Sequence, residues 1–348
     1  MNIALPANTP DIRDRVALQS ALAEACELEH GLACSYLYAG FSAKRHLSEG
    51  LTVRQQQLVR KWASQIYFIA SQEMLHLAQA WNLLAAVGGS AFVERPNFPQ
   101  PSRRYPLHIP LGLAKLDESS LARFIRFERP EATYDRDSFA FASAHVREHI
   151  DAEPQFDTIG RLYELIERAI TRDPSLIVGE AAAQVGPELV DFPDLVPVVD
   201  ADSAARAVRM IQDQGEGLQR DRIDCHYGMF RTMLRELCEE QQASRAAGAE
   251  FVPARNAIEN PCYEDDPAYR PQGSHLIEVA DTRAAGVLFD DLYGAMLAGL
   301  QFVFMHHSVD FAVKRRIAAL CIDIMPAVLV PLGEALTTMP SGRDDHTA

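Results

Sequence analysis

A long amphipathic helix between Thr52 and Val87 constrains the fold of this chain more than any other feature. Apolar side chains recur there at helical spacing, and Gly88-Gly89 follows as a typical helix stop. Two ionisable residues, Glu73 and His76, interrupt the apolar stripe. A helix of this kind must bury its stripe against other helices, so we expect a helical bundle.

The rest of the chain repeats this helical pattern and shows little strand-like alternation. We predict one all-α domain over 15–340, with a four-helix bundle in 15–242, extra C-terminal helices in 284–336, and disordered ends at 1–14 and 341–348. Within it, helices are expected over 14–44, 52–87, 119–127, 158–171, 203–242, 284–311 and 313–336. Proline-rich segments separate these helices, so we also expect long loop insertions in the bundle.

The composition is that of a globular protein with a full core. Of the 348 residues, 48% are hydrophobic and 23% are charged, and the formal net charge is −15. An acidic surface repels phosphate backbones and anionic lipids, so we expect neither nucleic acid nor a membrane as partner. The apolar segments 292–304 and 317–332 are shorter than a typical membrane span.

The cysteines and the first residues give an indication of the cellular compartment. The six cysteines form no C-x-x-C pair, a pattern that favours reduced thiols over a disulfide scaffold or a zinc knuckle. The first residues carry neither a basic start nor an apolar run of the signal-peptide kind. We therefore expect a cytoplasmic protein.

Glu73 and His76 are the first candidate ligands of a metal ion. Residues three apart lie on one helical face, so the carboxylate and the imidazole can reach the same ion. Glu29 interrupts the apolar stripe of the preceding helix in the same way. A carboxylate from one helix and E-x-x-H from its neighbour form half of the site that helix bundles use for paired iron or manganese. A buried Glu–His or Glu–Arg hydrogen-bonded pair would explain the same pattern without a metal.

The other half of such a site should come from the later helices. Two glycines flank Glu216 and permit a break in the helix that aims its carboxylate inward, and His226 follows as a second imidazole. Glu164 and Glu167 are candidates on the third helix, although both lie off its apolar stripe and plain surface carboxylates fit there as well.

Other residues near these ligands have weaker signals. Tyr36 and Tyr227 could orient the ligands or carry an electron, although ordinary packing explains them too. Glu27 and His30 repeat the E-x-x-H spacing, but their helical face carries Glu24 and is expected to be solvated.

Taken together, these residues resemble the ferritin-like family that contains iminophenyl-pyruvate dimer synthase of violacein biosynthesis and the related chromopyrrolate synthases. The resemblance covers about residues 15–335 as short blocks in a fixed order. The blocks are Leu28–Ala33 with Tyr36-Leu37, Glu73–Leu77 with Asn82–Leu84 and Gly88-Gly89, Phe124 with Glu128–Glu131, Ile159-Gly160 with Tyr163, Gln214–Gly217, and His226-Tyr227 with Phe230.

The resemblance implies a ferritin-like bundle and oxidative chemistry on a small amino-acid-derived molecule in secondary metabolism. It implies the metal ligands Glu29, Glu73, His76, Glu216 and His226. We expect a metal-dependent oxidoreductase that uses one or two iron ions, with manganese as an alternative, together with dioxygen or peroxide. A homo-oligomer would be in keeping with such bundles. The alternative is a non-catalytic metal-binding or storage protein, but the loop insertions and C-terminal helices are better suited to enclosing a substrate.

Overall fold

A computed structural model describes residues 12–93, 97–100, 110–130, 139–143, 147, 158–215, 223–344 and 346–348. Its main helices are α1 (Arg15–Ser42), α2 (Val53–Ala86), α3 (Glu118–Phe127), α5 (Ile159–Arg172), α6 (Pro187–Val190), α7 (Ala201–Gly215), α8 (His226–Ala246), α9 (Ala280–Met305), α10 (Phe311–Ile324) and α11 (Val330–Leu336). Two short parallel strands, β1 (Pro261–Cys262) and β2 (His275–Leu276), are the strands of the described residues. The prediction of an all-α fold is confirmed.

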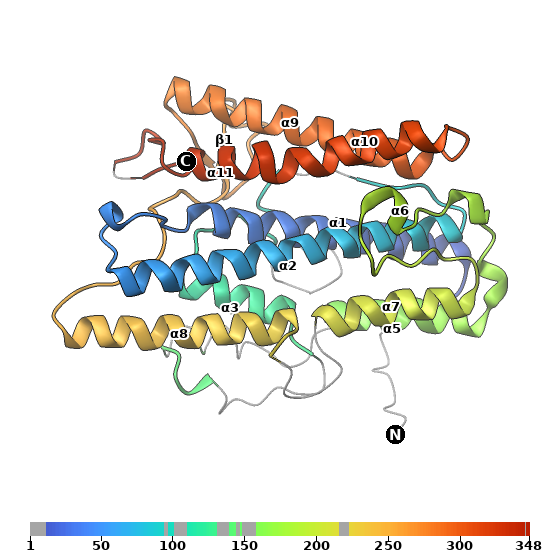
Figure 1. Cartoon of the computed structure of the whole chain (residues 1–348), viewed down its shortest axis with the longest axis horizontal. Coiled ribbons are helices and arrows are strands. Elements are labelled where there is room, and N and C mark those ends of the chain that lie inside the picture. Colours follow the sequence, from blue (N-terminus) through green and yellow to red (C-terminus); the bar gives the residue numbers. More distant parts are fainter. Residues whose placement is uncertain are drawn as a thin grey trace.

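Helices α1 and α2 form the continuous half of the bundle and lie side by side (Figure 1). Asp14 caps α1 by accepting a hydrogen bond from the amide of Ala17, and Thr52 caps α2 together with Gln55 in a capping box. Gly88, with φ of +79°, ends α2 in the left-handed conformation that glycine adopts without steric cost. Both helices therefore begin and end close to the residues that the sequence predicts.

The other half of the bundle consists of two interrupted columns. In Figure 1, α3 and α8 lie against one end of the α1–α2 pair, and α5 and α7 lie against the other end. The helical region predicted over 203–242, with its break near Gly215, is two helices, since α7 ends at Gly215 and α8 begins at His226. A consequence is that helix ends, rather than helix middles, meet at the centre of the bundle.

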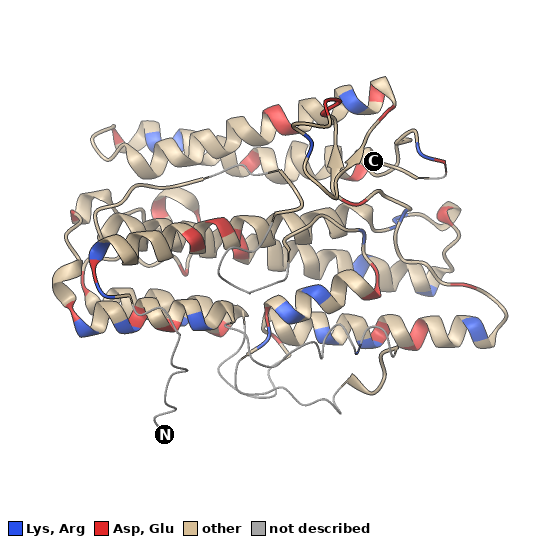
Figure 2. Cartoon of the chain, turned by 180° about the vertical axis from the view of Figure 1, so that it is seen from behind, with Lys and Arg blue, Asp and Glu red and all other residues tan. Residues whose placement is uncertain are grey.

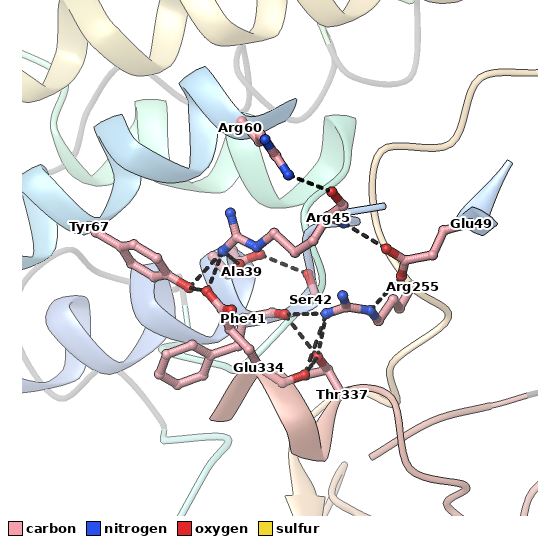
Figure 3. A network of polar contacts seen from close by, with 11 residues as sticks. Ala39, Phe41, Ser42, Arg45, Glu49, Arg60, Tyr67, Arg255, Glu334 and Thr337 are labelled. Atoms are coloured by element: carbon pink, nitrogen blue, oxygen red, sulfur yellow. Dashed lines mark hydrogen bonds and ion pairs between the residues drawn. The ribbon is translucent and has the colours of Figure 1, made fainter. Parts of the chain in front are cut away.

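Helices α9, α10 and α11 form a further layer on the opposite side of α1 and α2 (Figure 1). A polar network anchors this layer to the bundle (Figure 3). Arg45 forms an ion pair with Glu334 of α11, with 2.6 Å between Nη2 and Oε1. Arg255 bridges the two parts, donating through Nε to Glu49 at 2.7 Å and through Nη1 to the hydroxyl of Thr337 at 3.1 Å. Because Arg255 is buried, these contacts satisfy a charge that water cannot reach.

The C-terminal layer contains a long uncharged run. In Figure 2 the charged residues of this layer lie in separate short groups, and α9 carries none from Leu292 to Met305. Two helical runs, Ala280–Met305 and Phe311–Leu336, are long and apolar enough to cross a membrane by length and composition, with 22% of the most apolar window buried in each. These runs are longer than the apolar segments that the sequence analysis considered. Core helices of soluble proteins meet the same test when they are mostly buried, whereas these two runs bury only their inner faces against the bundle.

The last residues of the chain pack against the loops before and after the C-terminal helices. Thr347 pairs with Ala257 and Pro340 in isolated bridges, and Ala348 is buried. This arrangement differs from the disordered tail expected over 341–348, because backbone pairing provides an order that the polar composition does not indicate. At the other end, Ile12 is buried and Asp14 is a helix cap, while residues 1–11 lie outside the described part.

Candidate metal centre

The two continuous helices bring three of the predicted ligands together. Glu29 of α1 and Glu73 and His76 of α2 are all buried. Nδ1 of His76 lies 2.9 Å from Oε2 of Glu73 and 3.6 Å from Oε2 of Glu29. The spacing of three residues on α2 places both of its groups on one face, and that face meets Glu29 across the α1–α2 interface.

The interrupted columns supply the other two members of the cluster. His226 is the first residue of α8, and Glu128 directly follows the last residue of α3. Nδ1 of His226 lies 3.0 Å from Oε1 of Glu73 and 3.5 Å from Oε2 of Glu128. Gly215 ends α7 beside them, and a Cβ at this position would lie 3.2 Å from Oε2 of Glu128. The absence of a side chain there allows α7 to end close to the cluster.

Glu73 belongs to two possible ligand sets at once. One set is Glu29, Glu73 and His76, and the other is Glu73, Glu128 and His226. In each set the ligand atoms all lie within 4.8 Å of one another. Carboxylates and imidazoles from the helices of one bundle are the ligands of dinuclear iron and manganese sites. The donor atoms therefore fit two neighbouring metal ions with Glu73 between them.

A pair of buried atoms supports this fit. Oε1 of Glu73 and Nδ1 of His226 face each other at 3.0 Å, yet neither forms a hydrogen bond with another group of the described chain. A buried polar atom without a hydrogen bond is costly, so such atoms usually have a function. A proton on Nδ1 pairs the two atoms in the metal-free protein, and coordination of a metal ion would satisfy both in its place.

Amides behind the histidines direct the same ring nitrogen of each toward the cluster. Nε2 of His76 lies 3.0 Å from Oε1 of Gln214, and Nε2 of His226 lies 3.1 Å from Oε1 of Gln72. An amide oxygen can only accept, so each Nε2 carries the proton that it donates. In the neutral ring, Nδ1 is then left with a lone pair that points at the carboxylates. Such outer hydrogen bonds are typical of metal-bound histidines.

Two tyrosines hold the outer carboxylates. Tyr36 donates its hydroxyl hydrogen to Oε1 of Glu128, and Tyr163 donates to Oε1 of Glu29. Burial and the neighbouring carboxylates raise the pKa of both phenols above the ordinary value, so both remain neutral donors. Each outer carboxylate thus has one oxygen fixed by a tyrosine and the other directed toward a histidine.

The charges of the cluster are strongly coupled. Burial lowers the pKa of both histidines, but the carboxylates outweigh it and raise the pKa of His76 to about 10 and that of His226 to about 9. Burial also acts to raise the pKa of Glu73, but the two histidines outweigh it and lower that pKa. Burial raises the pKa of Glu29 to about 7 against the opposing effect of His76. At neutral pH without metal, the histidines are therefore cations around an ionised Glu73.

The structure does not bring every predicted residue into the cluster. The side chain of Glu164 is 44% exposed and forms an ion pair with Arg161, and Glu167 pairs with Arg209 at 3.2 Å. Both carboxylates therefore lie on the wetter face of α5, as the helical period of that segment indicates. Glu216 falls in 216–222, outside the described residues.

The two predicted tyrosines have different positions. Tyr36 contacts the cluster through Glu128. Tyr227 is also buried, and burial raises the pKa of its phenol while nearby Arg231 lowers it. Tyr227 is not among the residues that form the ligand sets or line the cavity beside them, because successive residues on α8 point in different directions.

Glu128 is the ligand candidate that the sequence analysis missed. In the sequence it belongs to one of the blocks that resemble the ferritin-like family. Glu128 lies four residues after Phe124 and seven after Leu121, so it continues the buried stripe of α3. A carboxylate in such a position is the same signal that identified Glu29 and Glu73.

A cavity of about 20 Å³ adjoins the cluster and is lined by Glu29, Glu73, His76 and Glu128 among others. A space of this size holds about one water-sized species. It is far too small for an organic substrate.

Comparison with known proteins identifies the family. A family model described as Ferritin-like matches residues 22–235 of this chain. The chain belongs to the Ferritin-like family. A solved structure of a ferritin-like protein from Caulobacter vibrioides has the same fold, with a TM-score of 0.55 at 19% identity, covering 93% of this chain and 98% of that one.

Two curated relatives show which proteins this chain is similar to. The chain is 28% identical to 2-imino-3-(indol-3-yl)propanoate dimerase of Chromobacterium violaceum, over 99% of this chain and 34% of the relative. It is also 28% identical to dichlorochromopyrrolate synthase of Lentzea aerocolonigenes, over 97% of this chain and 36% of the relative. The family resemblance that the sequence blocks predicted is confirmed. The chain spans about a third of the length of the curated relatives it matches.

Proposed function

We propose that this protein is a metal-dependent oxidoreductase that couples or oxidises a small indole-derived molecule in secondary metabolism. Two lines of support converge. The relatives are named as a dimerase and a synthase of indole-type intermediates, and both match nearly the whole of this chain. The bundle contains a buried cluster of three carboxylates and two histidines suited to a pair of iron ions.

The observation that carries the proposal is the position of Glu73 in both ligand sets. A carboxylate with one oxygen directed at His76 and the other at His226 is suited to bridging two ions. We propose Glu29 and His76 as further ligands of one ion, and Glu128 and His226 as further ligands of the other. Bound iron would supply the electron acceptor for the oxidation and the place where dioxygen or peroxide is reduced.

The residues of this chain prepare the site. Gln72 and Gln214 fix the tautomer of the histidines, while Tyr36 and Tyr163 restrain the carboxylates. A preorganised ligand set of this kind avoids reorganisation during the reaction. Burial of all five ligand side chains also excludes water from their charges.

A non-catalytic metal-binding or storage protein is the second candidate. The specific observation in its favour is the cavity of about 20 Å³ beside the cluster, which has room for an ion or a water but not for an indole. The two functions differ in how much iron the protein takes up and in whether an organic molecule is consumed.

Anaerobic loading with Fe(II) followed by exposure to oxygen distinguishes them. For an enzyme we expect about two irons per chain, no further uptake on addition of oxygen, and faster oxidation of an indole-derived imino acid than in the metal-free protein. Uptake of many irons per chain with no substrate oxidation would support storage. Absence of bound iron, manganese or another divalent metal at neutral pH would refute both.

A further inference from the structure

The outer side of the C-terminal layer carries large apolar side chains that no part of the described chain covers. In α10, Val313 is 46% exposed and Leu320 is 69% exposed. In the neighbouring α9, Leu288 is 51% exposed and Met305 is 42% exposed. Single apolar side chains are normal on a protein surface, but a group of them on adjoining helices marks a contact surface.

One stripe of α10 combines such apolar residues with charges of both signs. Its members are exposed and follow one another at spacings of three and four residues, which places them on one helical face: Val313, Arg316, Leu320 and Asp323. They lie opposite the residues that α10 buries, which are Lys314, Ala318 and Cys321. The stripe therefore points away from the rest of the molecule.

The two charged residues of this stripe have no ionic partner of their own. Within the part of the chain that the structure describes, neither Arg316 nor Asp323 forms an ion pair or a side-chain hydrogen bond. They are about 10 Å apart along the helix axis, too far to pair with each other. Exposed charges are commonly solvated, so the informative feature is their order, with Leu320 between them.

The stripe is complementary to a reversed copy of itself. The midpoint between Arg316 and Asp323 falls beside Leu320. A two-fold axis through this point places Arg316 of each copy opposite Asp323 of the other and brings the two Leu320 side chains together. In a parallel arrangement like charges would meet, so the charges select the antiparallel direction.

The charge of α10 differs in sign from that of the whole chain. The formal net charge of the chain is −15, so two copies repel each other over most of their surfaces. In contrast, α10 contains the basic residues Lys314, Arg315 and Arg316 and one acidic residue, Asp323. A second acidic copy is therefore attracted to this helix.

A lipid bilayer fits this surface less well than a second copy does. Asp323 lies on the exposed stripe of α10, and Asp291 is exposed on α9 between Leu288 and Ala295. A carboxylate that enters hydrocarbon without a partner is costly. In a contact between two copies the same carboxylates can be paired with arginine.

We propose that two copies of this chain form a two-fold dimer through the exposed stripe of α10. Leu320 is the apolar centre of the contact, and the two symmetry-related pairs of Arg316 with Asp323 set its direction. A stable dimer buries about 1,200–2,000 Å² in total, so the contact extends to the exposed residues Leu288 and Met305 of α9. The dimer does not depend on bound metal and does not rest on the proposed function.

Sedimentation velocity of the purified full chain tests the dimer. We expect twice the chain mass of 38.6 kDa. Leu320→Lys should weaken the dimer at least about a hundredfold, because it places two like charges at the axis. Val16→Lys is the matched control, since it adds the same charge at a 75% exposed residue of α1 and should change nothing. A monomer at about 100 μM, or a dimer that Leu320→Lys leaves intact, would overturn the proposal.

Exchange of the two charges tests the antiparallel direction. Arg316→Asp alone and Asp323→Arg alone should each weaken the dimer about tenfold, whereas the double variant restores opposite charges and should return to within about threefold of wild type. Arg168→Asp makes the same charge change on an exposed residue of α5 and should have no effect. A double variant as weak as the single ones would refute the arrangement. Binding of a monomeric chain to phosphatidylserine-containing vesicles would assign the surface to lipid instead.

Discussion

Replacing Glu73 by glutamine should change how the stability of the metal-free protein depends on pH. In the folded protein the carboxylates raise the pKa of His76 to about 10 and that of His226 to about 9. In the unfolded chain a histidine titrates near pH 6.5, the ordinary pKa of its imidazole. Between these limits the folded protein holds protons that the unfolded chain has released, so stability falls as pH rises. The contribution is complete below about pH 6.5, falls steadily as pH rises above that value, and is fully lost once pH has passed about 9 for His226 and about 10 for His76.

The size of the effect follows from the number of extra protons. Between pH 7 and 8 the folded state holds nearly two more protons than the unfolded state through these two histidines. Each extra proton changes the free energy of unfolding by about 1.4 kcal/mol per pH unit, so the two together give a slope of about −2.5 kcal/mol per pH unit. Glu73 is the charge that raises both pKa values most, and the glutamine variant should lose at least about half of this slope.

Urea unfolding of metal-free protein in the presence of a chelator, at several pH values between 7 and 8, measures the slope. Buried thiols such as Cys26 and Cys238 also have raised pKa values, but they are present in both proteins and cancel in the difference. Glu164→Gln is the matched control, because it removes an exposed carboxylate already paired with Arg161. A wild-type stability that is flat from pH 7 to 8, or equal slopes in wild type and Glu73→Gln, would refute the charge distribution derived for the cluster.

Four further outcomes are expected. Binding of metal to the metal-free protein at pH 7 should release about two to three protons, because both histidines and half of the Glu29 population must give up a proton. A pH indicator in weak buffer measures this release, and fewer than one proton per chain would contradict the expectation. Glu128→Gln should lower iron content from about two ions per chain to about one, measured by elemental analysis. Tyr36→Phe should weaken metal affinity about tenfold in competition with a chelator, while an unchanged affinity would remove its role as a support of Glu128. Arg255→Ala should lower the free energy of unfolding by about 2–3 kcal/mol, whereas Arg60→Ala, which loses an exposed 3.4 Å contact, should change it by less than about 0.5 kcal/mol.

The half of the metal centre on continuous helices could be predicted from sequence. Glu29, Glu73 and His76 interrupt regular apolar stripes, and helical period alone places them on buried faces. The argument is weaker for Glu128, which continues the stripe of α3 only beyond its last residue, and His226, which begins a helix, was proposed from its place after the glycine break and not from a helical stripe. Periodicity weakens at helix ends, because the chain direction there depends on the loop and on tertiary contacts.

His30 is a residue whose burial the sequence pattern failed to predict. Its helical face carries Glu24 and was expected to be solvated, yet His30 is buried and contacts Tyr293 of α9. The amphipathic pattern of α1 shows which of its faces are apolar. It does not show whether a helix from a distant part of the chain covers a face that carries polar residues. Contacts between residues more than two hundred positions apart lie beyond any local pattern.

The interruption of two columns at the centre of the bundle divides the ligand set into a fixed part and an adjustable part. The carboxylates and imidazole on α1 and α2 keep their spacing, because each is embedded in an unbroken helix. Glu128 and His226 are attached where helices end, so insertions or substitutions in the adjoining loops can shift one half of the centre without disturbing the other. A scaffold of this kind allows related chains to retune a metal pair through loop changes alone.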